Sequence, residues 1–354
     1  MFRRKNVSKG TKGRGSAKAK KTVKRLLEKP SHERMAEIAD LAMRENLLPF
    51  RTSLGSGVGD AGACAAVAKV MAKYPDDRLI QKEGCRAIEA LSDGDERNME
   101  RLGEANCCQL VEMVLDKFPD DASLQTQGCR AVTNLFNGEA NMKQFGRGKA
   151  CELVTAALRN FPRNYEVQIE ACGAAANLAN NFKENRNKPG RGGPGKAGIR
   201  PPATPAPPPP CPLPATLSMG VFPTKIDVQH AACVAVGNLA NRHAENKRRL
   251  GAAGACNKVC AALASFQSDR GVQYMACGAV GNLSHSNPQN CTRLGEAGGC
   301  VLITVGMNAF PEDRDMQHVG CAAVANLAIG NSANANRLLK AGARVAVQRA
   351  MEQF

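Results

Sequence analysis

The chain has 354 residues, of which 43% are hydrophobic but only 4% aromatic, and Trp is absent. An apolar content made mostly of Ala, Val, Leu and Cys favours closely stacked helices over sheets. The net charge is +16, and the longest apolar run, around 231–240, is far shorter than the ~20 residues that a membrane span needs. We therefore expect an all-α, soluble protein that resides in the cytoplasm or the nucleus and does not bind membranes.

Most of the positive charge lies in residues 1–29, which hold twelve Lys or Arg and a single acid and so carry +11. We expect residues 1–30 to form a disordered basic tail. Its candidate functional residues are Arg3, Arg4, Lys5, Lys18, Lys20, Lys21, Lys24 and Arg25. Three hypotheses stay open for the tail: a nuclear-import signal read by an import receptor, nonspecific contact with RNA, DNA or an acidic surface, and an organelle presequence.

A fixed register of cysteines runs through the rest of the chain. The register residues are Cys85, Cys129, Cys172, Cys233, Cys277 and Cys321, at spacings of 44, 43, 61, 44 and 44 residues. Asn stands five residues after the Cys in all but the first of these units. Because the cysteines recur at fixed positions and no apolar signal segment precedes them, we expect free thiols in a reducing compartment rather than disulfides.

Each period predicts three helices. In one unit a short segment, 101–105, is followed by an amphipathic segment, 108–118, and by a third helix that ends near Leu135. Pro119 and its acidic neighbours end the second helix and begin the third. A period of ~40–47 residues built in this way is typical of stacked armadillo or HEAT repeats.

The segments 234–240 and 245–254 resemble the third helix, the short first helix and the Ala-Gly hinge of the armadillo family, and the resemblance covers roughly residues 60–354. The Gln-x-x-Gly-Cys start of the third helix, as in 125–129, is similar to armadillo units of leucine-rich-repeat kinases. The importin branch of the family carries Trp four residues before the Asn, and this chain has other residues there. We predict a right-handed armadillo/HEAT-type α-solenoid of about six three-helix units, each 43–44 residues long.

In chain order, a degenerate helical N-terminal cap is expected at 31–60 and units 1–3 at 61–186. A Pro/Gly-rich disordered insert is expected at 187–222, because eleven prolines crowd into 189–214. Units 4–6 follow at 223–340, the fourth without its short first helix. Residues 341–354 are expected to form a truncated cap helix, with a truncated sequence as the competing interpretation.

No motif argues for catalysis, a cofactor or a metal. The segment 190–196 matches the letters of a phosphate-binding loop, and 57–62 those of a dinucleotide fingerprint, but neither follows a predicted strand. The five histidines and the cysteines show no metal-ligand spacing. We therefore predict that the protein is not an enzyme.

The strongest functional candidate is one face of the third helices, where positions four apart align. We expect this face to line a concave groove that binds an extended peptide, since each Asn amide offers a donor and an acceptor, as the armadillo resemblance implies. The alternative is that the Asn bonds a neighbouring helix within the solenoid. The candidate groove residues are Lys82, Arg86, Arg130, Asn134, Asn177, His230, Asn238, Tyr274, Asn282, His318 and Asn326.

Two functions follow from these features. The first is a protein-binding scaffold or adaptor whose groove is basic at its N-terminal end, where Lys82, Arg86 and Arg130 favour acidic segments. The second is a nucleic-acid-associated or nuclear factor whose affinity lies in the basic tail. A steep dependence of binding on salt would distinguish the second from the first.

Overall fold

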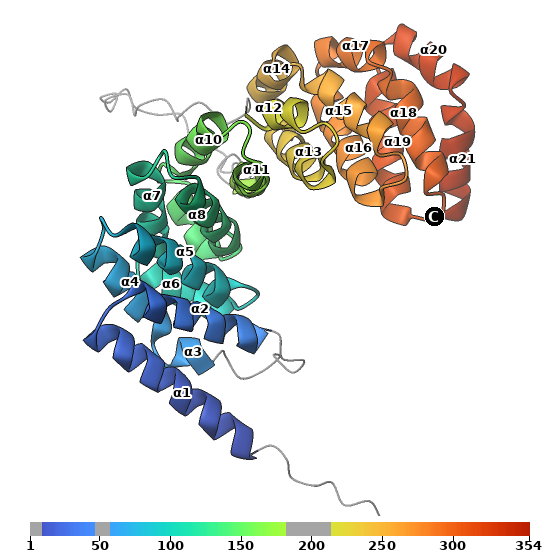
Figure 1. Ribbon diagram of the computed structural model, residues 1–354. Helices are drawn as coiled ribbons and strands as arrows, with labels where there is room; N and C mark the ends of the chain where they lie inside the picture. The colour runs from blue at the N-terminus through green and yellow to red at the C-terminus, as the bar shows by residue number, and fades with distance from the viewer. Residues whose placement is uncertain (1–8, 47–56, 182–213) are drawn as a thin grey trace, which may run out of the picture. The chain divides into compact units, whose positions relative to one another are not determined.

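The computed structural model describes residues 9–46, 57–181 and 214–354, and these form 21 helices and no strand (Figure 1). The predicted all-α repeat fold is confirmed in the described residues. The chain divides into two compact units, residues 1–157 (unit 1) and 158–354 (unit 2). Each unit is described by itself.

Unit 1 begins with a pair of helices, and three-helix repeats follow. Its helices are α1 (Lys9–Glu28), α2 (His32–Asn46), α3 (Gly57–Asp60), α4 (Ala63–Lys73), α5 (Arg78–Ser92), α6 (Glu96–Glu104), α7 (Cys107–Lys117), α8 (Ala122–Leu135) and α9 (Glu139–Phe145). Helix α10 (Ala150–Asn160) spans the division between the units. The third helices stack on one another, so that α2 packs on α5 and α5 on α8.

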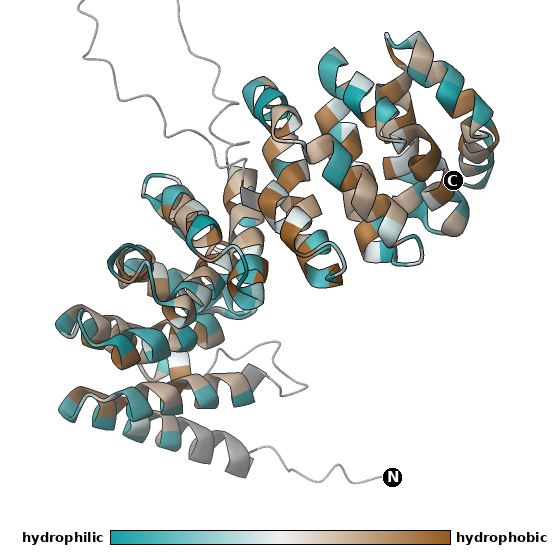
Figure 2. Cartoon of the chain, turned by 45° about the horizontal axis from the view of Figure 1, so that its top comes forward, coloured by the Kyte–Doolittle hydropathy of each residue, from teal (hydrophilic) through white to brown (hydrophobic). Residues whose placement is uncertain are grey.

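Unit 2 continues the same pattern. Its helices are α11 (Tyr165–Asn181), α12 (Pro214–Val221), α13 (Ile226–Ala240), α14 (Ala244–Ala252), α15 (Ala255–Ser265), α16 (Arg270–Ser284), α17 (Pro288–Glu296), α18 (Gly299–Ala309), α19 (Arg314–Ala328), α20 (Ser332–Lys340) and α21 (Ala343–Gln353). The third helices α11, α13, α16 and α19 stack in that order. Figure 2 shows hydrophobic and hydrophilic residues alternating along the helices, as expected where one side of each helix packs.

The second half of the expected basic tail is a packed helix. Ala19, Val23 and Leu26 of α1 are buried, and α1 packs on α2, α3 and α4. The prediction of disorder up to residue 30 is therefore wrong from Ala17 onward, because three apolar residues at helical spacing give this segment a face to bury. Residues 1–8 lie outside the described residues.

The end of the expected insert is also helical. Residues 187–213 lie outside the described residues, but α12 supplies the second helix of the fourth repeat and buries Ala215 and Met219. The run of prolines concealed this helix from the sequence analysis. Helices α11 and α13 pack directly against each other, so the stack of third helices continues across the interruption as predicted.

Local signals at the breaks of each repeat explain the helix ends. Asp77, Asp121, Asp269 and Asp313 are N-caps whose side chains accept backbone N–H bonds from the third helices. Between the first and second helices the chain turns through a left-handed residue, which is Gly254 (φ 81°) in one repeat and Asn106 (φ 60°) in another. Only Gly, and less readily Asn, adopts this conformation at low cost.

The register cysteines form the interior of the stack. Cys85, Cys129, Cys172, Cys233 and Cys277 are fully buried, whereas Cys321 is half-buried. All fourteen described cysteines are free thiols, and burial raises the pKa of Cys85, Cys233 and Cys277 to about 12. These cysteines act as small apolar residues between packed helices.

A glutamine four residues before each register cysteine joins the second helix to the third. The Nε2 group of Gln273, for example, donates to the carbonyls of Leu263 and Phe266 at 2.8 and 3.1 Å. The same double bond is made by Gln81, Gln125, Gln168, Gln229 and Gln317. Each Gln satisfies two carbonyls that the end of the second helix leaves without an intrahelical partner.

Candidate functional site

The candidate site is the third-helix face of unit 2, which we define by the residues at three successive turns of α11, α13, α16 and α19. The first turn holds Ile169, His230, Tyr274 and His318, the second Gly173, Val234, Gly278 and Ala322, and the third Asn177, Asn238, Asn282 and Asn326. All four Asn are half-buried.

The Asn side chains connect successive third helices. The Nδ2 group of Asn238 donates to the carbonyl of Ala176 at 2.9 Å, and that of Asn282 to Gly237 at 2.9 Å. Asn326 donates to Gly281 in the same way at 3.1 Å. In every case the acceptor is the residue just before the Asn position of the preceding repeat. One of the two Nδ2 hydrogens of each amide is therefore used inside the stack, which corresponds to the structural alternative named above.

The oxygens of these amides make fewer hydrogen bonds within the described residues than the nitrogens do. Among the described residues, no protein donor reaches Oδ1 of Asn238 or Asn282, whereas Oδ1 of Asn326 lies 3.3 Å from Nδ1 of His285. Because the Nδ2 bonds fix the plane of each amide, its oxygen is held in one direction at a half-buried position. The face thus presents a row of hydrogen-bond acceptors.

On α16 and α19 the middle turn of the face carries small side chains. A Cβ placed on Gly278 would meet no atom within 4 Å, and Ala322 is exposed. These positions are the ones at which the importin branch carries Trp. Without bulky side chains there, the backbone of a ligand can approach the helices between the Asn oxygens and the first turn.

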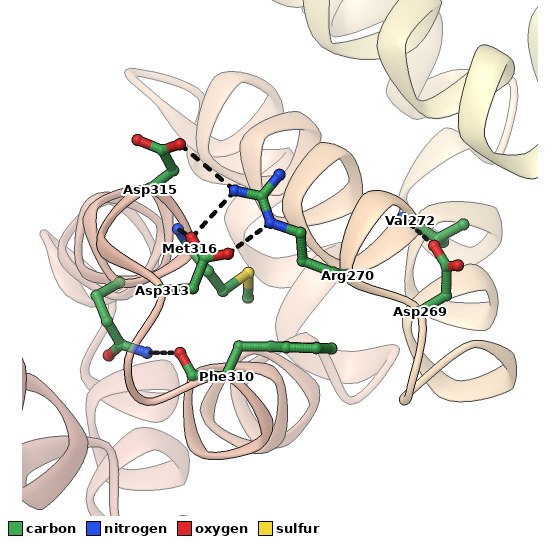
Figure 3. Close-up of polar contacts among 8 residues, drawn as sticks. Asp269, Arg270, Val272, Phe310, Asp313, Asp315 and Met316 are labelled. Carbon is green, nitrogen blue, oxygen red and sulfur yellow. Dashed lines mark hydrogen bonds and ion pairs between the residues drawn. The ribbon is translucent and has the colours of Figure 1, made fainter.

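The rim of the face is held by charges that link neighbouring repeats (Figure 3). Arg270, at the start of α16, binds Asp313, the N-cap of α19, through Nε–Oδ2 at 2.5 Å and Nη2–Oδ1 at 3.1 Å. Asp315 accepts a further, longer bond from Nη2 at 3.4 Å. The same guanidinium lies 5.4 Å from the centre of the Tyr274 ring. Tyr274 is therefore held beside a cation at the edge of the face.

Two histidines complete the rim at the same turn of their helices. His318 is exposed and His230 is half-buried. A Cβ on Gly271 would lie 3.3 Å from Cδ2 of His230, so the imidazole packs against the start of α16. The structure places both residues on the predicted face, beside Tyr274 in the repeat between them.

In unit 1 the predicted basic end of the face is partly neutralised. Arg86 binds Asp40 at 2.5 Å and Glu83 at 3.0 Å. Burial opposes the charge of Arg86, but the hydrogen bonds to Glu83 and Asp40 outweigh it and raise the pKa of the guanidinium. The expected preference for acidic segments therefore cannot rest on Arg86 alone. Asn134 donates to the carbonyl of Glu89 at 3.4 Å, a longer bond than its counterparts in unit 2.

The remaining sequence candidates form no metal-binding group in the part of the chain that the structure describes. Among the described residues, no group of three His, Cys, Asp or Glu could hold a metal ion. The segment 190–196 lies outside the described residues, and 57–62 forms the short helix α3 and the turn after it. In the described part of the chain, no helix is long and apolar enough to cross a membrane.

The described part of the basic tail presents its cations to solvent. Lys18, Lys20, Lys21, Lys24 and Arg25 are exposed on α1. Lys24 pairs with Glu28 and Arg25 with Glu37, both at 3.7 Å. Arg3, Arg4 and Lys5 lie outside the described residues.

A second set of asparagines, on the first helices, was missed by the sequence analysis. Asn290 donates to the carbonyls of Lys247 and Leu283 at 2.9 and 3.2 Å, and Arg293 donates to its Oδ1 at 3.0 Å. Equivalent buried residues are Asn98, Asn141, Asn246 and Asn334. The available signal was a Leu-Gly pair that follows the Asn by four and five residues in three of these five first helices, as in Asn290 and 294–295.

Comparison with solved structures finds engineered and designed repeat proteins. One engineered protein has a TM-score of 0.69 and 20% identity, covering 95% of this chain and 78% of its own. A designed armadillo repeat protein in complex with the peptide (KR)4 has a TM-score of 0.54 and 19% identity, covering 75% of this chain and 99% of its own. Computationally designed armadillo repeat proteins for modular peptide recognition give 0.56 and 17%, covering 74% and 99%.

No family model and no curated protein matches the chain in sequence. At identities of 20% or less, the structural matches show the fold, which is an armadillo-like repeat fold.

Proposed function

We propose that this protein is a non-enzymatic scaffold that binds an extended segment of a partner protein along the third-helix face of unit 2. The observation that carries the proposal is the row of Asn oxygens on α13 and α16, which are fixed by Nδ2 bonds and accept no hydrogen bond from the described protein. A peptide in an extended conformation has unpaired backbone N–H groups that suit such acceptors.

The Nδ2 bonds limit what the Asn amides can supply to a bound peptide. Each Nδ2 carries two hydrogens, one of which is bonded to the preceding repeat, so each amide of Asn238 and Asn282 keeps its oxygen as an acceptor and one N–H as a donor. We therefore still expect these carboxamides to offer both a donor and an acceptor. Tyr274 and His318 stand at the rim, where they suit partner side chains.

The burial of the register thiols fits a binding role better than catalysis by these cysteines. Burial raises the pKa of the thiols of Cys233 and Cys277 to about 12, so that these groups stay protonated and weakly nucleophilic. The solved structures with the same fold include one armadillo protein with a bound peptide. That binding is a property of the designed protein and supports the same use of the face here.

The test blocks the face without removing the ladder. A peptide is selected from a random display library against the full chain, and its Kd is measured for Gly278→Phe and Ala322→Phe. Both positions have open space, so these variants should fold normally and weaken binding at least tenfold. The matched control is Val301→Phe, because Val301 is exposed on α18. Unchanged affinity in both face variants, with normal folding, would overturn the proposal.

A second function is supported by the exposed cations of α1. Lys18, Lys21 and Arg25 lie at helical spacing on its solvent side, and residues 1–29 carry +11. A nucleic acid or another polyanion suits such a surface. Replacing these three residues by Gln keeps the buried face of α1 and should reduce the salt dependence of RNA binding. If RNA binding and its salt slope stay unchanged, this function is refuted.

A further inference from the structure

The C-terminal ends of the third helices in unit 2 carry different side chains on the same backbone. The C-cap of α13 is Asn241 (φ −59°, ψ 117°), and the C-cap of α16 is His285 (φ −55°, ψ 116°). The two residues stand at the same position of successive repeats. Any difference between the contacts of Asn241 and His285 with the next third helix therefore comes from their side chains.

The imidazole of His285 reaches the asparagine of the next third helix. Its Nδ1 atom lies 3.3 Å from Oδ1 of Asn326. Nδ2 of Asn326 donates to the carbonyl of Gly281 at 3.1 Å, which fixes the amide with its oxygen toward the imidazole. A carboxamide oxygen can only accept, so Nδ1 of His285 carries the hydrogen of this bond. His285 thus uses the acceptor that Asn326 would offer to a peptide.

At the end of α13 the equivalent contact is not made. Among the described residues, no hydrogen bond joins Asn241 to Asn282. Asn282 is nevertheless held to the preceding repeat in the same way as Asn326, through Nδ2 and the carbonyl of Gly237 at 2.9 Å. Its oxygen therefore keeps its direction and stays open to a ligand.

The backbone of His285 is anchored from the side of α14. Its N–H donates to the carbonyl of Gly281 at 3.1 Å, and its own carbonyl accepts a bond from Nζ of Lys247 at 2.5 Å. Lys247 is only 4% exposed, and its buried cation holds the C-terminal end of α16 by bonding a carbonyl there. The base of the imidazole is therefore fixed beside α19, although the ring itself is exposed.

We propose that His285 limits how far a bound peptide extends along the third-helix face of unit 2, an inference that rests on the proposed function of this face. Open acceptors stand on α13 and α16, where Asn238 and Asn282 keep their oxygens, and His285 ends the row before α19. A peptide that spans α13 and α16 finds an acceptor for a backbone N–H on each. It gains none from the oxygen of Asn326 unless the imidazole is displaced. His285 is thus a specificity-determining residue that sets the length of segment the face favours.

The test compares peptides of different length with and without the imidazole. The probe is a peptide selected from a random display library against the full chain, together with versions extended at either end by a short run of Ala or of Pro. Pro has no N–H to donate, so its extensions cannot use a new acceptor. Kd is measured by isothermal titration calorimetry for the wild type, for His285→Ala and for Asn241→Ala. Asn241→Ala is the matched control, because it removes the side chain of the equivalent cap without opening an acceptor.

The expected result is a gain that needs both an open acceptor and a peptide N–H. In His285→Ala, one of the two Ala extensions should tighten binding about threefold to tenfold, the range expected of one added hydrogen bond, and the Pro extensions should not. The wild type and Asn241→Ala should show no such gain. The double variant His285→Ala/Asn326→Ala should lose it, because the acceptor is gone. The melting temperature of His285→Ala should stay unchanged, because Lys247 bonds the backbone carbonyl and not the imidazole.

Two kinds of failure are told apart by the variants that block the face. Where Gly278→Phe or Ala322→Phe weakens binding of the unextended peptide, the inference is refuted if the Ala extension helps the wild type as much as His285→Ala. It is refuted equally if His285→Ala gains nothing, or if the double variant keeps the gain. Where neither Phe variant changes the affinity, the peptide does not use this face, and the proposed function fails together with the inference.

Discussion

The first prediction concerns the close contact between first helices, and the change is Gly295→Ala. The new Cβ would lie 1.8 Å from Oδ1 of Asn334, which forces this fully buried side chain to move. Asn334 would then lose Nδ2 bonds of 2.8 Å to Cys291 and 3.3 Å to Leu327. Overpacking costs about 1–3 kcal/mol, and each buried polar group left unpaired costs about 1–3 kcal/mol. Ala returns roughly 0.5–1 kcal/mol relative to Gly in a helix.

We therefore expect Gly295→Ala to lower the free energy of unfolding by about 2–4 kcal/mol, measured by urea denaturation with circular dichroism. The matched control is Gly278→Ala, whose Cβ meets no atom within 4 Å. It should stabilise the protein by roughly 0.5–1 kcal/mol. A double variant with Asn334→Ala should cost less than the sum of the single changes, because the steric conflict is gone. Equal stability of Gly295→Ala and Gly278→Ala would refute the reasoning.

Three further predictions follow from the stack. Gln273→Leu should destabilise the protein by about 1–3 kcal/mol in the same urea assay, because the carbonyl of Leu263 loses its donor and that of Phe266 keeps only the N–H of Asp269; a change below about 0.5 kcal/mol would contradict this. In native protein at pH 8, Cys277 should resist alkylation, measured by mass spectrometry, because burial raises its pKa to about 12 and leaves roughly one thiolate in 10⁴; rapid labelling would contradict its burial. Deleting residues 190–213 should leave the helicity and the melting temperature nearly unchanged, because Asn238 already bonds Ala176 across the interruption; loss of helicity would contradict this.

The repeat fold could be predicted from the sequence because its signals recur. A Cys every 43 or 44 residues in the uninterrupted units and a Pro or Asp at each break give the register and the helix ends without any three-dimensional information. Two expectations, at residues 17–30 and 214–222, were wrong. There the Lys-rich or Pro-rich composition was given more weight than the spacing of the apolar residues. In each case a few buried apolar residues, such as Val23 and Met219, hold a helix among many Lys or Pro.

The candidate face could be located from the sequence, but the use of its hydrogen bonds could not. The repeat register gives Asn238, Asn282 and Asn326 the same position on three successive third helices, so that they share one face. Whether each Nδ2 points to a ligand or to the preceding helix depends on how closely the helices approach. Gly237 and Gly281 supply the carbonyls that accept these bonds. That relation joins residues 45 positions apart, which no local pattern reveals.

The measurement that tests the central claim most directly is hydrogen exchange of the full chain with and without the selected peptide, read by mass spectrometry. If the third-helix face of unit 2 binds the peptide, protection should rise in α13, α16 and α19, where helix ends and exposed amides exchange most readily. It should stay unchanged in α1 and α21. Protection confined to α1 or α21, with none in the third helices, would contradict peptide binding at this face.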